Sequence, residues 1–237
     1  MIQIMNDVKE KSKATAIYLR DLDTSDTELR DFLIAEGFIK AEMPDTHVIE
    51  NLKWNTYDDF LETISYRSRK HVRKFILHLE NEFEVSIAEK SDYTYLDECY
   101  NLYKNVKKQS YVINTFDLPK KLFKNAFDNP NWEVLLLKVG PEKKLGCFVF
   151  SYKSSNNNFC PFVIGLNYEL NQRYYCYRQA LFQLLKRANQ LNAGKIFLGM
   201  DASIEKQKMG AAVIPKSVYI QASSNYNMDV ISMFKQN

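Results

Sequence analysis

The stretch GKIFLGMDASIEKQKMG, residues 194–210, decides the fold of this 237-residue chain. Gly194 stands where a helix ends, after an amphipathic segment that predicts a helix over Asn171–Leu191. A short apolar strand follows at Lys195–Leu198, and Gly199 opens a turn into a short basic helix. This order of helix, strand, glycine turn and basic helix is more specific than any other pattern in the sequence.

Apolar periodicity predicts further elements before and after this stretch. We expect helices at residues 25–36, Tyr57–Asn81, Asp92–Lys107 and Pro119–Phe127. We expect strands at Ala14–Leu19, Phe38–Met43, His47–Leu52, Phe83–Ala88, Glu133–Val139, Gly146–Tyr152, Phe159–Leu166 and Ser217–Ala222, with a turn at Pro44-Asp45. Helices and strands mixed in this way predict an α+β fold, a mixed sheet flanked by helices.

The chain shows no low-complexity linker, so residues 13–237 are expected to form a single domain. Residues 1–12 are polar and are expected to be a flexible tail. Two half-repeats, 13–90 and 91–237, that share one sheet are also compatible with the pattern of elements.

Composition excludes several classes of protein. With 32 Lys and Arg against 29 Asp and Glu, the net charge of +3 argues against a broad nucleic-acid surface. Three histidines and four scattered cysteines without a Cys-x-x-Cys pair predict no metal site. No run of about 18 apolar residues and no apolar N-terminal segment occurs, so we expect no membrane insertion and a cytoplasmic protein.

The segment Phe159–Gly210 resembles the acyl-CoA N-acyltransferase (GNAT) superfamily. It is most similar to the FemAB-like branch and to acetyltransferase-like domains associated with biotin-pathway condensing enzymes. Those proteins carry two glycines separated by ten residues, with basic residues shortly before the second one. Gly199, Lys206, Lys208 and Gly210 occupy those places.

A serine- and arginine-rich helix over residues 65–74, preceded by Gly37-Phe38 and Pro44, resembles the same group. The resemblance extends over most of residues 30–222. It implies a GNAT-like fold with a cleft where central strands splay. It also implies acyl-CoA or acetyl-CoA as co-substrate, no metal, and a small-molecule amine as acceptor.

The glycine turn supplies the candidate catalytic residues. The FemAB-like resemblance implies that Lys206 and Lys208 hold a phosphate or polarise an acyl carbonyl. The alternative is that the two lysines belong to a solvated helix and have no such role. Asp201 and Glu205 are candidate bases for a protonated amine, or equally helix caps and i,i+4 partners. Tyr168 follows the strand beside the expected cleft and is a candidate proton donor to a leaving thiolate.

The start of the Asn171–Leu191 helix is the best anion site that the sequence offers, because first-turn amides and the helix dipole attract negative charge. The alternative is an exposed helix start with ordinary surface arginines. The family usually has glycines there, and this chain has tyrosines. The residues expected to bind the donor are Gln172, Arg173, Tyr175, Arg178, Gly199 and Gly210.

Three functions therefore stay open. The first is N-acyl transfer from a CoA thioester to an amine by direct attack. The second is aminoacyl transfer from a charged tRNA, as the FemAB-like relatives perform, although the low net charge makes a nucleic-acid partner the weaker expectation. The third is a catalytically degenerate fold that binds without turnover. The basic helix Arg67–Lys74 fits a phosphate contact, an RNA contact or a plain solvated face.

Overall fold

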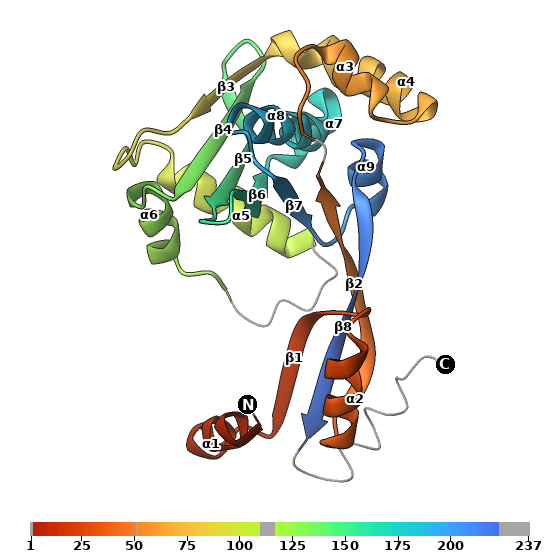
Figure 1. Cartoon of the computed structure of the whole chain (residues 1–237). Helices are drawn as coiled ribbons and strands as arrows, with labels where there is room; N and C mark the ends of the chain where they lie inside the picture. Colours follow the sequence, from red (N-terminus) through yellow and green to blue (C-terminus); the bar gives the residue numbers. More distant parts are fainter. Residues whose placement is uncertain (1, 51, 110–116, 223–237) are drawn as a thin grey trace. The chain divides into compact units, whose positions relative to one another are not determined.

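The computed structural model describes residues 2–50, 52–109 and 117–222 (Figure 1). Its helices are α1 (Ile2–Ser12), α2 (Thr27–Ala35), α3 (Tyr57–Glu62), α4 (Tyr66–Phe75), the 3₁₀ helix η1 (Leu77–Glu82), α5 (Leu96–Gln109), α6 (Lys120–Asp128), α7 (Tyr168–Tyr174), α8 (Cys176–Gln190) and α9 (Ser203–Lys208). Its strands are β1 (Ala16–Asp23), β2 (Ile39–Ile49), β3 (Phe83–Ile87), β4 (Trp132–Val139), β5 (Lys144–Lys153), β6 (Asn158–Leu166), β7 (Lys195–Gly199) and β8 (Ala212–Ala222).

Hydrogen bonding joins the strands in the order β1-β8-β2-β7-β6-β5-β4-β3. β6 and β7 run parallel, whereas β3, β4, β5 and β6 form an antiparallel series. The expected mixed sheet flanked by helices is confirmed. Contacts divide the chain into two compact units, residues 47–212 and residues 1–46 with 213–237. The single domain and the half-repeats that meet at residue 90 stay predictions.

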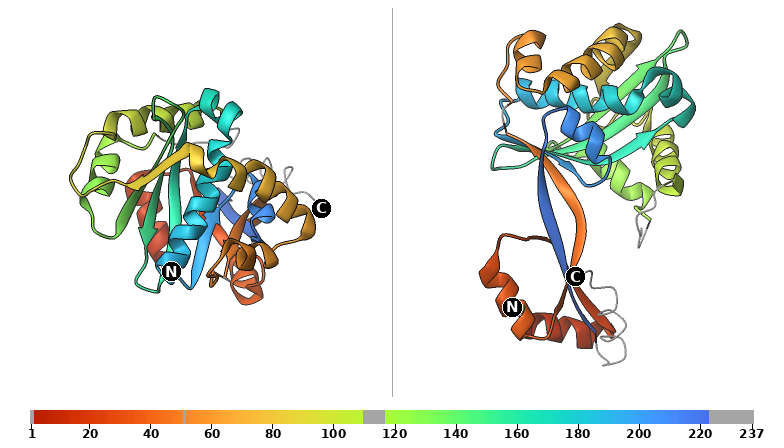
Figure 2. Two further views of the ribbon diagram at one scale, coloured as in Figure 1. Left: turned by 90° about the horizontal axis from the view of Figure 1, so that it is seen from above. Right: turned by 90° about the vertical axis from the view of Figure 1, so that its right-hand side faces the viewer.

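The larger unit has a core on each face of its strands. Alternate residues of β4 and β5 point to opposite sides, so Leu137 and Cys147 join the core under α8 while Phe148 and Phe150 join the core under α5 and α6. Figure 1 and the right view of Figure 2 show α8 on one side of these strands and α5 and α6 on the other. Helices therefore cover both faces of these strands.

The smaller unit is built on β1 and β8, which pair antiparallel. Leu33, Phe38 and Tyr219 form its buried core. Residues 2–12 form α1 where a tail was expected, because Ile2 and Met5 pack against this core. Burial of apolar side chains stabilises a helix that its polar sequence alone does not predict.

Three predictions differ from the structure in where an element is divided or joined. The helix predicted over Tyr57–Asn81 is divided into α3, α4 and η1, because Ser65 accepts a hydrogen bond from the Ser68 N–H at 3.2 Å and so caps a new helix. The strands predicted on either side of Pro44-Asp45 are one strand, β2, since the φ of proline also suits extended backbone.

The third is the helix predicted over Asn171–Leu191, which is divided between α7 and α8. Tyr175 has a left-handed backbone conformation at φ 55° and separates the two helices. Asn167 caps α7 by accepting a hydrogen bond from the Leu170 N–H at 3.2 Å. The helix start that was expected to bind an anion therefore lies at Cys176 instead.

Candidate functional site

A cavity opens where β6 and β7 diverge. These parallel strands pair only at their beginnings, Asn158 with Lys195 and Phe159 with Ile196. Beyond these pairs the two strands enclose a cavity of about 600 Å³, within the range of small-molecule sites. The expected cleft between splayed central strands is confirmed.

Both layers of helices contribute to this cavity. Tyr177, Leu181 and Leu184 of α8 line it from one face of the sheet, and Val106 and Gln109 of α5 line it from the other. The cavity thus passes through the plane of the sheet.

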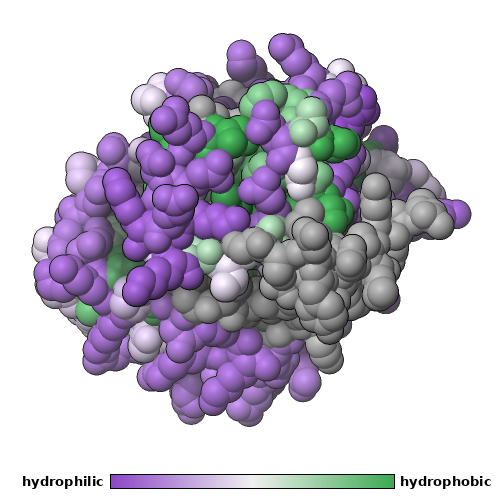
Figure 3. Space-filling view, turned by 90° about the horizontal axis from the view of Figure 1, so that it is seen from below, coloured by the Kyte–Doolittle hydropathy of each residue, from purple (hydrophilic) through white to green (hydrophobic). Residues whose placement is uncertain are grey.

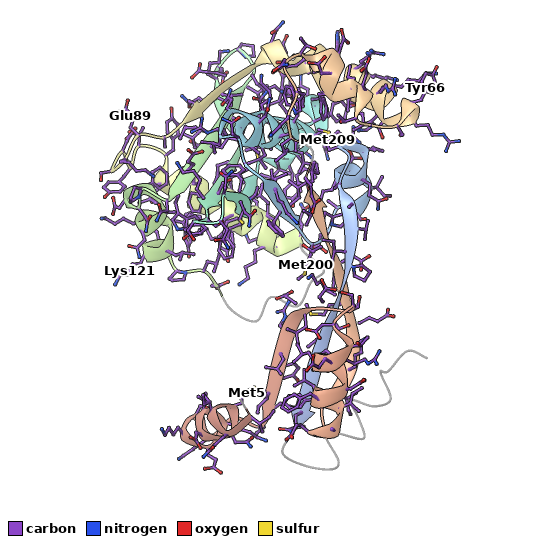
Figure 4. All side chains as sticks on the ribbon, viewed as in Figure 1. Met5, Tyr66, Glu89, Lys121, Met200 and Met209 are labelled. Atoms are coloured by element: carbon purple, nitrogen blue, oxygen red, sulfur yellow. The ribbon has the colours of Figure 1, made fainter. Side chains whose placement is uncertain are left out.

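The loop between β7 and α9 forms the polar wall of the cavity. Gly199, Asp201 and Ala202 all have positive φ, at 72°, 61° and 47°. Glycine adopts this conformation without strain and aspartate tolerates it, so the backbone of this loop is most strained at Ala202. Met200, labelled in Figure 4, lies between them at the end of β7.

Two buried side chains hold this loop. His47 places Nδ1 3.0 Å from the carbonyl oxygen of Gly199 and Nε2 2.8 Å from Oγ of Ser203. Lys206 donates from Nζ to the same Gly199 oxygen at 3.1 Å and to the carbonyl of Met200. The sequence alone does not indicate this role for His47, because its partners lie about 150 residues away in the chain.

Among the described residues that line the cavity, Lys206 is the only cation. Its side chain is 3% exposed, and its hydrogen bonds go to backbone carbonyls. Burial lowers its pKa to about 8, against the opposing effect of the Asp201 carboxylate. At neutral pH the ammonium is therefore mostly charged and can stabilise a developing oxyanion.

Asp201 and Tyr168 also line the cavity, as the sequence analysis required of a base and an acid. Asp201 is exposed at the loop, and Tyr168 begins α7. Burial raises the pKa of Tyr168, so its hydroxyl keeps its proton at neutral pH. Asn171 and Tyr177 line the same side, and neither was among the predicted site residues.

Glu205 is the centre of an ion cluster. Arg178 donates to its two oxygens at 2.9 and 3.2 Å, His71 Nε2 lies 3.0 Å away, and Lys208 Nζ lies 3.0 Å away. The cluster joins α4, α8 and α9. Partial burial opposes ionisation, but the hydrogen bonds from Arg178 and Lys208 hold the pKa of Glu205 below its usual value.

This cluster bears on three predicted site residues. A carboxylate with a lowered pKa is a poor proton acceptor, which disfavours Glu205 as a base. Lys208 and Arg178 donate hydrogen bonds to Glu205. The Arg178 guanidinium also lies over the rings of Phe75 and Tyr175, at 5.0 and 4.8 Å from their centres. None of the three lines the cavity.

The remaining predicted donor-binding residues are dispersed. Gly199 lines the cavity, whereas Gln172 and Arg173 are exposed on α7. Gly210 follows α9 at φ 91°, and a Cβ there would lie 3.1 Å from Ile64. The glycine at position 210 is therefore explained by its positive φ and by its close packing against Ile64.

The N-terminus of α8 differs from a phosphate-binding loop. Asn171 Oδ1 accepts a hydrogen bond from the Tyr177 N–H at 2.9 Å, so this first-turn amide is already bonded. Tyr175 precedes the helix, and Cys176 is fully buried. The amides of α8 are therefore less open to phosphate than the sequence indicated.

No family model and no curated protein matches the sequence. Solved structures do match. L-PGS from Bacillus licheniformis has a TM-score of 0.64 at 11% identity, covering 100% of this chain and 77% of that one. FemX has a TM-score of 0.61 at 14% identity, covering 99% and 78%.

A GCN5-related N-acetyltransferase from Kribbella flavida gives a TM-score of 0.58 at 9% identity, covering 96% of this chain and 76% of that one. The chain has the acyl-CoA N-acyltransferase fold. This fold extends over nearly the whole chain.

Across residues 2–50, 52–109 and 117–222, no helix combines the length and hydrophobicity needed to cross a bilayer. The same ranges hold no group of three His, Cys, Asp or Glu side chains arranged to bind a metal ion. Figure 3 shows mostly hydrophilic residues on one face of the molecule, with hydrophobic residues between them.

Proposed function

We propose that this protein is an N-acyltransferase that moves an acyl group from a CoA-type thioester to an amine by direct attack. The observation that carries the proposal is the position of Lys206, whose ammonium lines a cavity that crosses the sheet between β6 and β7. A carbonyl placed there would have a fixed positive charge beside it.

The reaction needs three proton transfers. Asp201 takes a proton from the ammonium form of the acceptor, and the free amine attacks the thioester carbon to form the C–N bond. The Lys206 ammonium stabilises the negative oxygen of the tetrahedral intermediate. As the C–S bond breaks, Tyr168 gives its proton to the leaving thiolate, and its phenolate takes back a proton from the positively charged nitrogen of the new C–N bond.

The test is release of CoA thiol from acetyl-CoA with lysine, putrescine or glycine ethyl ester as acceptor, together with calorimetry of acetyl-CoA binding. Lys206→Met should lower the transfer rate about 10²–10³-fold, as loss of an oxyanion partner does. The matched control is Lys121→Met on the surface of α6, labelled in Figure 4. Absence of both binding and thiol release would leave the fold without this function.

A second candidate is aminoacyl transfer from a charged tRNA, and one observation favours it. α4 carries Arg67, Arg69, Lys70, Arg73 and Lys74 within ten residues, and all but Arg69 are exposed. Tyr66 is 66% exposed at its start, with the Lys70 ammonium 4.7 Å from its ring centre. A basic helix with an exposed aromatic ring suits a phosphate backbone with unstacked bases.

The two donors can be separated by salt dependence. If α4 binds tRNA, Lys70→Glu with Lys74→Glu should weaken tRNA binding and reduce the slope of log K against log salt by about 0.9 per lost contact. Lys121→Glu with Lys143→Glu changes the net charge by the same amount at exposed positions outside α4 and is the control. An unchanged slope in the α4 variant would exclude α4 as the tRNA contact and favour the thioester donor.

A further inference from the structure

A serine and a histidine that do not line the cavity lie within hydrogen-bond distance of each other. Oγ of Ser203, at the start of α9, is 2.8 Å from Nε2 of His47. The other ring nitrogen of His47, Nδ1, is 3.0 Å from the carbonyl oxygen of Gly199. A hydroxyl beside a base whose far side is held by a third group has the geometry of an activated nucleophile.

The backbone decides which ring nitrogen of His47 is the base. A carbonyl oxygen can only accept a hydrogen bond, so Nδ1 carries the proton that points to Gly199. In the neutral ring Nε2 then has a free electron pair, which accepts the proton of the Ser203 hydroxyl. The side-chain amide of Gln207 donates from Nε2 to the same serine oxygen at 2.7 Å, which agrees with a hydroxyl proton directed to His47.

The pairing of β2 with β7 fixes the position of the histidine. His47 stands opposite Gly199 in this antiparallel pair, and it is 1% exposed. The Gly199 carbonyl also accepts a hydrogen bond from the buried Lys206 at 3.1 Å, so the group that orients the ring is itself held in place. The base is therefore rigid and buried, whereas Ser203 is partly exposed and open to a substrate.

Ser203 also follows a strained turn from a strand into a helix. β7 ends at Gly199 and α9 begins at Ser203, and Ala202 between them has a left-handed backbone at φ 47°. In α/β-hydrolases a strained turn from strand to helix presents the nucleophilic serine, with glycines two residues away on either side. Here Asp201 and Glu205 stand in place of those glycines. Backbone strain of this kind is concentrated at functional sites.

We propose that Ser203 is a nucleophile with His47 as its general base, and that the pair takes the acyl group of small activated esters. Ser203 Oγ attacks the ester carbonyl carbon while its proton passes to Nε2 of His47. The bond from that carbon to the leaving oxygen breaks, and Nε2 gives the proton to this oxygen. Water then attacks the Ser203 ester and gives a proton to Nε2. The acid leaves, and the proton returns to Ser203 Oγ.

This activity is separate from the proposed transfer to an amine, in which the amine attacks directly and the protein carries no ester. Ile204, next to Ser203 on α9, is 70% exposed and offers an apolar contact to the acyl or leaving group. Short acyl esters with an aromatic leaving group suit this open position. Thiol release from acetyl-CoA with an amine acceptor is measured in its own assay, and neither result decides the other.

The experiment treats the full chain with p-nitrophenyl acetate and, in a second sample, with phenylmethylsulfonyl fluoride, and maps the adducts by mass spectrometry of peptides. We expect release of p-nitrophenolate and a sulfonyl group on Ser203. Ser203→Ala should lower the release to the uncatalysed rate. The matched control is Ser25→Ala, because the exposed Ser25 hydroxyl donates to a carboxylate, Asp23 Oδ1 at 2.8 Å, instead of to a histidine.

His47→Gln tests the base, since its amide retains a donor and an acceptor but is not basic. We expect p-nitrophenolate release to fall about 10²-fold in this variant while its urea denaturation remains cooperative.

A second pair of variants keeps the buried histidine. The thiol of Ser203→Cys should react with iodoacetamide about tenfold faster than that of Ser25→Cys, because Nε2 takes its proton. Absence of a sulfonyl adduct on Ser203, equal labelling of Ser203 and Ser25, or equal rates of the two thiols overturns the inference. The contact between His47 and Ser203 would then only hold the loop.

Discussion

The side-chain Oδ1 of Asn171 accepts a hydrogen bond from the backbone N–H of Tyr177 at 2.9 Å. The bond joins the last turns of α7 to the first turn of α8 across the left-handed Tyr175. It occupies a first-turn amide of α8, which an anion bound at this helix start would otherwise use. The charge that recognises the donor is therefore better sought at Lys206 than at the start of α8.

Arg178 gives the clearest contrast between the two interpretations. The sequence alone predicts that Arg178→Ala weakens donor binding by about 1.5–3 kcal/mol. The structure predicts instead a loss of about 1–3 kcal/mol in the free energy of unfolding, because Glu205 loses its two-bond partner. Urea denaturation and calorimetry with acetyl-CoA measure the two quantities on one sample.

Arg173→Ala is the control for this substitution, since Arg173 is exposed on α7 and lies over the Tyr174 ring at 5.1 Å. It should change stability by less than about 0.5 kcal/mol. If Arg178→Ala weakens acetyl-CoA binding while stability stays at the wild-type value, the ion cluster is not the main role of Arg178.

His71 reports on the same cluster. Burial lowers its pKa, and the charge of Glu205 raises it in opposition. Glu205→Gln removes the raising effect, so the pKa of His71 should fall further. Titration of the His71 ring protons by NMR measures this directly, and a pKa that rises or stays constant would contradict the 3.0 Å contact.

The cluster also predicts acid sensitivity. The pKa of Glu205 is lower in the folded chain than its usual value, so the stability that it contributes is present above the usual value and is lost as the pH falls through the folded pKa. Glu205→Gln should therefore flatten the acid side of the stability profile. Thermal denaturation between about pH 3 and pH 7 tests this, with the wild type as reference.

The sequence predicted the hairpin well and the helix breaks poorly. β4 and β5 end within two residues of the predicted strands, because two apolar runs flank a turn that contains Gly140. The helix predicted over residues 57–81 failed at Ser65, since apolar periodicity continues across a break that one serine cap decides. The apolar periodicity of a long segment does not show where a local hydrogen bond such as that of Ser65 ends one helix and begins the next.

Some residues of the candidate site could be predicted from the sequence and others could not. Lys206, Asp201 and Tyr168 could be predicted to lie together because each follows the carboxyl end of a strand. His47 could not, since its partners Gly199 and Ser203 are distant in sequence. Nor could the pairing of Glu205 with α4 and α8, which depends on how three helices pack.

Gly165 yields a prediction about packing. Its φ is not positive, but a Cβ there would collide with the Phe148 ring and lie 2.8 Å from Cβ of Leu102. Gly165→Ala should therefore push α5 away from β6 and lower the free energy of unfolding by about 1–3 kcal/mol. Gly194→Ala is the control, because the nearest atom to its Cβ would be 3.7 Å away.

Denaturation in urea compares the two glycine variants. Equal stability of both would show that α5 and β6 lie farther apart than the structure has them. A loss of stability in Gly165→Ala alone would confirm the close approach of the helix that carries Val106 and Gln109 to the cavity.

Lys206 makes a prediction at alkaline pH. Folding lowers its pKa from 10.5 to about 8 because the ammonium is buried. At and below about pH 7 the Lys206 amine is protonated in both the folded and the unfolded chain. The burial of its charge then lowers the free energy of unfolding by its full amount. Between about pH 8 and 10.5 the unfolded chain holds a proton that the native state lacks, so the free energy of unfolding rises with pH, by about 3 kcal/mol for a shift of this size.

Lys206→Met removes this titration, so the difference in stability between wild type and variant should be constant from pH 6 to 7 and should then shift in favour of the wild type. Urea denaturation at half-unit steps of pH measures the difference. The transfer rate should move the other way, because the neutral amine that stabilises the fold above pH 8 no longer stabilises an oxyanion. A difference that stays constant up to pH 10 would mean that Lys206 is not buried as a cation, and the role proposed for it at the cavity would fail with it.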